Sequence, residues 1–243
     1  MIDFSLDKVF HVHIPKTGGT TLNDRMRNNS NFINGGHSFY NANFPVLGSR
    51  IEDRSWKNFY QKGYTNDMTI IVIIRNPFDW LRSYYNHSGK GFFGFLNHSG
   101  WQGCNDYHKF CSFDDFIQGY LSPSLNWHVP PLKTSQIGQL QGLENASECV
   151  VVFNEYLDNF IDLIEAETGH RSGLVHSRNI GSYRKVSNSE VYRSKDVDQI
   201  MEKYEYFFEL SGYNLDGFRV RPTSPYIKLS KENLLDLSTK GYY

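Results

Sequence analysis

The sequence of 243 residues predicts one α/β domain with a central, mostly parallel β-sheet flanked by helices. Short apolar runs alternate along the chain with stretches of helical periodicity, which is typical of a parallel sheet. The run Thr69–Ile74 is continuously β-branched, as in strands that are covered on both faces. No repeat or interdomain linker interrupts residues 1–243. A chain of this length can bury about 70% of its unfolded surface without a metal or disulfide.

The first predicted strand covers residues 9–14 and leads through a glycine-containing turn into a helix at 22–27. Residues 28–49 are rich in Asn, Gly and Ser, so we expect a loop there. A weak helix is expected at 54–61. Thr69–Ile74 is the second strand, and a helix over 77–86 follows, because Pro77 suits a first helical position.

Residues 88–112 are predicted to form a long loop rich in glycine and aromatic residues, which exceeds an ordinary connection in length. Residues 219–243 are expected to form a C-terminal extension with a short helix at 231–238. The other predicted elements are a helix at 113–120, a strand at 149–153, a helix at 157–168 capped by Gly169, and a helix at 197–210.

Charge and composition exclude several classes of protein. The net charge of −1 argues against nucleic-acid binding through bulk positive charge, so any anion site must be local. The longest apolar run, residues 68–74, is far shorter than the roughly 20 residues of a membrane span. We see no secretion signal, and three cysteines suit a reducing compartment. We therefore expect a cytoplasmic protein with no nucleic-acid or membrane partner.

Residues 13–22, HIPKTGGTTL, have the features of an anion-binding loop. Gly18 and Gly19 allow a ligand to approach the backbone closely, and the helix that follows offers unpaired N–H groups. Lys16 adds a mobile positive charge. Hydroxyl donors come from the threonines of the motif, which are Thr17, Thr20 and Thr21. The GxxxxGK[ST] pattern is absent, which disfavours a nucleotide kinase or GTPase, and an ordinary strand-to-helix turn is the alternative.

A second polar segment, RNPFDWLRSYY, occupies residues 75–85. Arg75 ends a buried strand, where open α/β sheets bind ligands. Ser83 lies about two turns into the next helix. A guanidinium and a hydroxyl that converge there would suit a second phosphate. Alternatively, Arg75 forms a structural ion pair with Asp79, and Ser83 is an ordinary helix residue.

Together, PKTGGTT and RNPxxxxxS resemble the sulfotransferases that use 3′-phosphoadenosine 5′-phosphosulfate (PAPS). HIPKTGGTTL is closest to the branch that contains the heparan sulfate 2-O- and 6-O-sulfotransferases and bacterial relatives. The resemblance spans about residues 9–214, with looser matches at 150–157 and 179–182. It implies a P-loop-like three-layer fold. It also implies transfer of a sulfuryl group, without a metal, to a hydroxyl of a carbohydrate or small metabolite, with release of adenosine 3′,5′-bisphosphate.

The resemblance also implies roles for single residues. Lys16 would neutralise charge that develops on the oxygen bridging sulfur and the 5′-phosphate. Arg75 and Ser83 would hold the 3′-phosphate, and His37, in a glycine-flanked loop, would be the general base. The residues expected to hold the 5′-phosphate are Thr17, Gly18, Gly19, Thr20 and Thr21. The other candidate bases are a carboxylate or one of His87, His98, His128 and His176.

Three alternative functions are also compatible with the sequence. An ATP-dependent phosphotransferase would need Mg²⁺, for which Glu155 at the end of a strand could be a ligand. A non-catalytic nucleotide-binding module would bind the nucleotide without turnover, and a glycan-binding protein would use the aromatic loop instead. His11 and His13 are expected to be hydrogen-bonded core residues. No metal site is predicted, because the spacing of Cys104, His108 and Cys111 fits no standard zinc motif.

Overall fold

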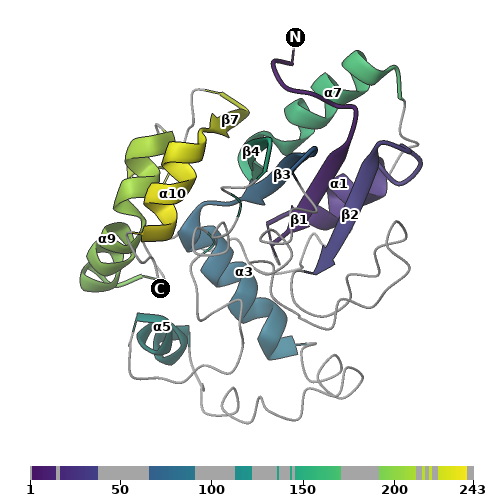
Figure 1. Cartoon of the computed structure of the whole chain (residues 1–243). Coiled ribbons are helices and arrows are strands. Elements are labelled where there is room, and N and C mark those ends of the chain that lie inside the picture. Colours follow the sequence, from purple (N-terminus) through teal and green to yellow (C-terminus); the bar gives the residue numbers. More distant parts are fainter. Residues whose placement is uncertain are drawn as a thin grey trace, which may run out of the picture.

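The structure is a computed structural model that describes residues 2–14, 17–37, 66–90, 113–121, 136, 143, 146–170, 192–211, 215–216, 219–220 and 224–239. These residues form a five-stranded sheet with helices on both faces (Figure 1). The strands lie in the order β2-β1-β3-β4-β7, and only β7 runs antiparallel to its neighbour. The α/β architecture and the mostly parallel sheet are therefore as predicted.

The central strands form where the sequence is continuously apolar. In β3 the side chains alternate, so that Ile70 and Val72 face one side of the sheet while Ile71 and Ile73 face the other. All six residues of this strand are buried. The strands of the sheet are β1 Val9–His13, β2 Phe32–His37, β3 Thr69–Ile74, β4 Glu148–Phe153 and β7 Tyr226–Leu229. A separate two-stranded ribbon pairs β5 Leu215–Asp216 with β6 Arg219–Val220.

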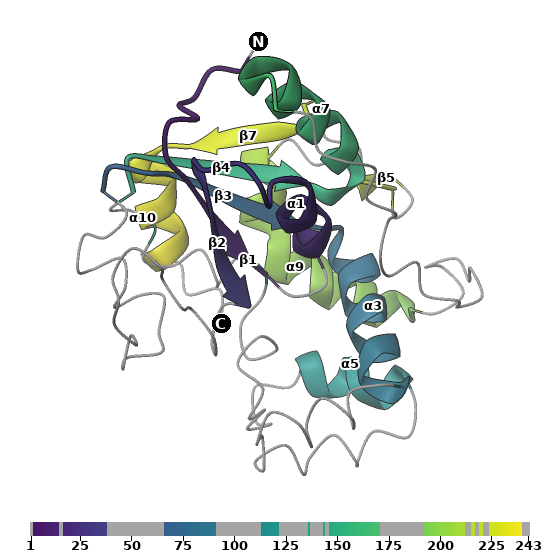
Figure 2. The same ribbon diagram turned by 90° about the vertical axis from the view of Figure 1, so that its right-hand side faces the viewer.

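Helices cover the two faces of the sheet unequally (Figures 1 and 2). One face packs against Trp80, Ile117, Tyr204 and Leu234, each from a different helix. These helices are α3 Pro77–Lys90, α5 Phe113–Leu121, α9 Ser194–Ser211 and α10 Lys231–Thr239. The other face packs against α1 Gly19–Arg25 and α7 Leu157–Thr168. None of the helices in the described ranges has the length and apolar character of a membrane span.

The ends of two helices follow the sequence signals. Asn76 precedes α3, and its side-chain oxygen accepts a hydrogen bond from the N–H of Phe78 at 2.9 Å, which is an N-cap contact. Helix α7 ends as predicted, because Gly169 adopts a left-handed conformation with φ of 66°. Both helices therefore begin or end at residues whose chemistry favours that position.

Two strands of the five-stranded sheet, β2 and β7, were not predicted, and neither were β5 and β6 of the two-stranded ribbon. Residues 28–49 were expected to form a loop, but they contain β2, which pairs in parallel with β1. Its FINGGH sequence has two glycines, so its strand conformation depends on pairing with β1 rather than on propensity. The C-terminal extension contains β7, which pairs with β4. Residues 88–90, predicted as the start of the long loop, instead form the end of α3. The rest of that loop, 91–112, and the helix predicted at 54–61 lie outside the described residues.

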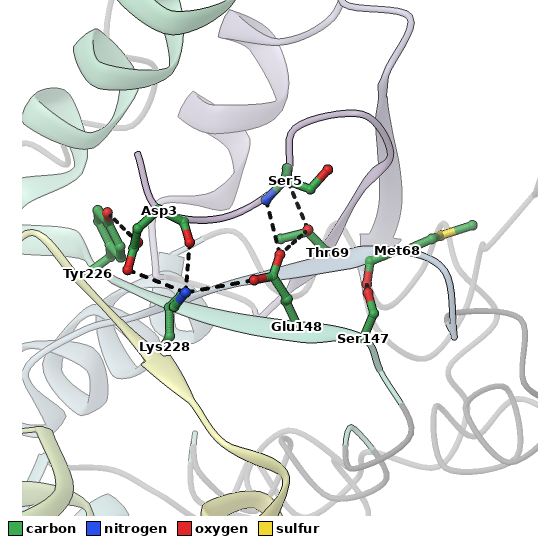
Figure 3. A network of polar contacts seen from close by, with 8 residues as sticks. All are labelled: Asp3, Ser5, Met68, Thr69, Ser147, Glu148, Tyr226 and Lys228. Atoms are coloured by element: carbon green, nitrogen blue, oxygen red, sulfur yellow. Dashed lines mark hydrogen bonds and ion pairs between the residues drawn. The ribbon is translucent and has the colours of Figure 1, made fainter. Parts of the chain in front are cut away.

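The segment before β1 crosses the amino end of the parallel strands (Figure 3). The N–H of Ser5 donates to Glu148 Oε2 at 3.0 Å, and Thr69 Oγ1 donates to the carbonyl of Ser5 at 2.8 Å. Lys228 of β7 donates to the carbonyl of Asp3 at 2.7 Å. These contacts fasten the N-terminal segment to β3, β4 and β7, at the opposite end of the sheet from both predicted motifs.

Candidate functional site

Both motif segments begin at the carboxyl end of the parallel strands. Strands β1 and β3 are neighbours, with Val12 paired to Val72, and β3 pairs with β4 so that Ile74 lies opposite Phe153. The turn into α1 therefore starts at the same end of the sheet as Arg75. This is the end at which open α/β sheets bind ligands. Lys16, which the first motif places in the turn, lies outside the described residues.

The turn between β1 and α1 is held by bonds within its own backbone. Gly18 has a φ of 99°, a left-handed conformation that favours glycine. Its carbonyl accepts hydrogen bonds from the N–H groups of Thr21 at 2.9 Å and Leu22 at 3.5 Å. Thr20 and Thr21 are half-buried at the start of the helix.

Thr17 has a different environment from the other threonines of the motif. Its side chain is fully buried, and its hydroxyl donates to the carbonyl of Ile14 at 2.7 Å. A hydroxyl has a single proton to donate, and here it is used inside the turn. Any contact of Thr17 with a phosphate would therefore come from its backbone.

Two buried histidines lie directly under the turn, as expected of core residues. His11 and His13 have stacked rings with centroids 5.5 Å apart. His11 Nδ1 lies 2.6 Å from Asn23 Oδ1, and the ring nitrogen donates because an amide oxygen only accepts. A Cβ on Gly19 would lie 2.4 Å from His13 Cδ2. The second glycine of the motif therefore allows α1 to pack closely on these rings.

The backbone of Arg75 is fixed by a buried glutamine that was not identified from the sequence. Gln136 is only 1% exposed; its Oε1 accepts the N–H of Arg75, and its Nε2 donates to the Arg75 carbonyl, both at 2.8 Å. Tyr204 lies behind it, and its hydroxyl accepts the N–H of Gln136 at 3.4 Å. Burial raises the pKa of Tyr204, so the hydroxyl that accepts the N–H of Gln136 stays protonated and neutral. The Arg75 backbone is thus anchored from the side of α9.

The remaining residues of the second motif lie in or beside α3. Ser83 is buried, with only 6% of its surface exposed. Asp79, the alternative partner for Arg75, forms an ion pair with Arg82 at 2.7 Å. Tyr192 donates a 2.6 Å hydrogen bond to the carbonyl of Phe78 and so holds the first turn of α3. The first turn of α3 is therefore fixed on more than one side.

The end of β4 contacts both motif segments, which sequence reasoning missed. Asn154 and Glu155 begin a short 3₁₀ helix, η4 Asn154–Tyr156. Asn154 Nδ2 donates to the carbonyl of Thr17 at 2.8 Å. Glu155 Oε1 accepts the N–H of Asn76 at 2.9 Å. The available signal was a pair of polar residues directly after a buried strand, inside the looser family match at 150–157. Neither that match nor the Mg²⁺ alternative for Glu155 indicated these two contacts.

His37 does not lie in a loop, contrary to expectation. It is the last residue of β2, paired with His13 of β1, and the register of the two strands shifts between His11 and His13. Its backbone therefore reaches the carboxyl end of the sheet, where both motifs lie. His87 lies in α3. The other candidate bases, His98, His128 and His176, lie outside the described residues, as do Cys104, His108 and Cys111.

Within the described ranges, no group of three or more His, Cys, Asp or Glu side chains could hold a metal ion. Comparison of the chain with protein-family models, curated proteins and solved structures finds no match. The functional assignment therefore rests on the two motifs and on the geometry that surrounds them.

Proposed function

We propose that the protein is a sulfotransferase that moves the sulfuryl group of PAPS to an acceptor hydroxyl. The observation that carries the proposal is the common location of the two motifs. Their segments start at the carboxyl ends of the neighbouring parallel strands β1 and β3, and both are hydrogen-bonded to residues that follow β4. A donor with phosphates at its 3′ and 5′ positions needs two anion sites of this kind side by side.

The residues present fit such a donor. The turn at Gly18 leads into a helix in which the amides before Thr21 have no acceptor within the helix. Thr20 and Thr21, both half-buried, add hydroxyl groups. These groups would hold the 5′-phosphate, whereas Arg75 and Ser83 would hold the 3′-phosphate, since a guanidinium forms strong charge-assisted bonds with phosphate. We accordingly propose that the sheet and its first turn belong to a P-loop-like fold.

When bound, PAPS supplies the sulfuryl group and a bisphosphate leaving group. Lys16 would stabilise negative charge that develops between sulfur and the 5′-phosphate. His37 would accept the proton of the acceptor hydroxyl, because an imidazole that is neutral near pH 7 can act as a base. We infer a carbohydrate or small metabolite as acceptor from the branch that the first motif resembles, and a cytoplasmic location from the odd number of cysteines.

Calorimetric titration tests the donor assignment directly. Purified protein is titrated without Mg²⁺ with adenosine 3′,5′-bisphosphate and, separately, with ADP. The proposal requires a clear preference for the bisphosphate. Absence of bisphosphate binding, or binding of ADP only after Mg²⁺ is added, would refute it and favour a phosphotransferase.

A labelled sulfate donor then tests turnover against a panel of hydroxyl acceptors. Replacement of Lys16 by alanine should reduce turnover much more than bisphosphate affinity, because this lysine acts mainly on charge that develops during the reaction. Replacement of His37 by alanine should likewise reduce turnover while binding persists. If His37→Ala changes neither quantity, His37 is not the base; if, in addition, the wild-type protein transfers no sulfate, a non-catalytic binding module would be favoured.

A further inference from the structure

We propose that Asn154 and Glu155 are positioning residues that fix the spacing between the two phosphate-binding segments, and so give selectivity for a doubly phosphorylated nucleoside. This inference rests on the proposed function for its ligand. The structure shows how one short turn after β4 holds two other segments of the chain.

Asn154 holds the turn between β1 and α1 in two ways. Its side-chain amide donates to the carbonyl of Thr17, a contact between residues 137 positions apart in the sequence. It also packs against Gly18, because a Cβ at that glycine would lie 2.4 Å from Asn154 Nδ2. The position of this turn is therefore set by β4 as well as by β1.

Glu155 holds the other segment. Its carboxylate accepts the N–H of Asn76, which directly follows Arg75, across 79 positions of sequence. Asn76 also caps α3 through the N–H of Phe78. The contact of Glu155 therefore fixes the point at which the chain leaves β3 and enters the helix that carries Ser83.

The two contacts come from adjacent residues of one short element. Element η4 is continuous with β4 on one side and with α7 on the other, and Leu157 at the start of α7 is buried. This makes η4 a common support for both segments. A ligand with two linked phosphates gains affinity when its two sites are already at the right spacing. A ligand with one phosphate gains nothing from that spacing.

The test compares three ligands and four variants by calorimetry. The ligands are adenosine 3′,5′-bisphosphate, adenosine 5′-monophosphate and adenosine 3′-monophosphate. Asn154→Ala and Glu155→Ala should each weaken the bisphosphate about fivefold more than either monophosphate, the scale of one lost hydrogen bond. Glu155→Gln should retain wild-type affinities, because its amide oxygen still accepts the N–H of Asn76. Asp158→Asn, at an exposed acid in the first turn of α7, is the matched control and should change nothing.

Two outcomes would overturn the inference. Equal weakening of all three ligands would mean that these residues only stabilise the fold. A loss in Glu155→Gln as large as in Glu155→Ala would mean that the negative charge matters, as expected for a cation ligand, rather than the hydrogen-bond acceptor.

Amide hydrogen exchange of the unliganded protein tests the positioning role without any nucleotide. Glu155→Ala, but not Glu155→Gln, should speed exchange at the N–H of Asn76. Asn154→Ala should speed exchange at Thr21 and Leu22, because their amides donate to the carbonyl of Gly18 in the turn that Asn154 holds. Unchanged exchange would refute the inference. If the wild-type protein binds no bisphosphate, the proposed function fails, while these exchange rates still decide whether the two residues hold the segments.

Discussion

Alanine substitutions at two glycines should destabilise the protein by different amounts. Gly18 and Gly169 both have positive φ, at 99° and 66°. A side chain at either position must adopt the left-handed conformation, which costs about 1–2 kcal/mol. At Gly169 nothing lies within 4 Å of the added Cβ. At Gly18 the Cβ would lie 2.4 Å from Asn154 Nδ2 and 3.0 Å from Leu157 Cδ2.

The contacts around Gly18 set the size of the difference. Crowding of a packed site costs about 1–3 kcal/mol. Displacement of Asn154 also removes its bond to the Thr17 carbonyl, which is worth about 1 kcal/mol. We therefore expect Gly18→Ala to lower the free energy of unfolding by about 3–6 kcal/mol and Gly169→Ala by about 1–2 kcal/mol. At roughly 2–4 °C per kcal/mol for a chain of this size, the melting temperatures should fall by about 14 °C and about 4 °C.

Urea unfolding followed by circular dichroism measures both changes, and a double variant identifies their cause. In an Asn154→Ala background the closest atom is gone, so Gly18→Ala should cost about 1–2 kcal/mol less than in the wild-type protein. The same background should leave the cost of Gly169→Ala unchanged. Equal losses at the two glycines, or full additivity of Gly18→Ala with Asn154→Ala, would refute the reasoning.

Three further outcomes are expected. Arg75→Ala should weaken adenosine 3′,5′-bisphosphate by about 1.5–3 kcal/mol in calorimetry, the scale of a charged hydrogen bond, with ADP hardly affected; similar losses for both would contradict the 3′-phosphate assignment. Burial raises the pKa of the Cys149 thiol to about 12, so iodoacetamide at pH 8 should leave this cysteine unmodified in peptide maps until denaturant is added. Burial would raise the pKa of Asp196, but hydrogen bonds from Arg193 and Gln118 outweigh it and lower the pKa below 3.8. The folded carboxylate therefore adds stability above pH 3.8 that is lost as the pH falls below that value. Asp196→Asn should cost about 1.5–3 kcal/mol in urea unfolding at pH 6 and clearly less near pH 2.5, and a cost independent of pH would exclude this charge effect.

The elements that were predictable carry their signal within one short segment. Thr69–Ile74 is continuously apolar because both of its faces are covered, and helix 157–168 ends at a glycine that adopts the expected left-handed conformation. β2 and β7 carry no such signal. β2 contains two glycines, and β7 has four residues of which only Leu229 is buried, so both depend on distant partners for their strand conformation.

The candidate site likewise has one part that is predictable from the sequence and one part that is not. Both motifs could be located from residue types and spacing, because each is continuous in the sequence. The contacts that fix them come from Gln136, Asn154 and Glu155, across 61, 137 and 79 positions. Residue type does not reveal which distant backbone group a buried amide or a carboxylate will bind. For the same reason, the motif suggested an anion contact for the hydroxyl of Thr17, whereas the structure directs it to Ile14.

β4 runs between the two ends of the sheet, and each end carries contacts with other segments of the chain. Glu148 at its first position accepts the N–H of Ser5, and Asn154 and Glu155 directly after its last position hold the two motif segments. Six residues of strand span about 20 Å, which exceeds the 7–10 Å beyond which substitutions act independently. The bonds at the amino end can therefore affect the stability of the sheet without changing the spacing at the carboxyl end. If the spacing sets nucleotide selectivity, selectivity depends on the carboxyl end of β4 alone, whereas contacts at both ends of the strand contribute to stability.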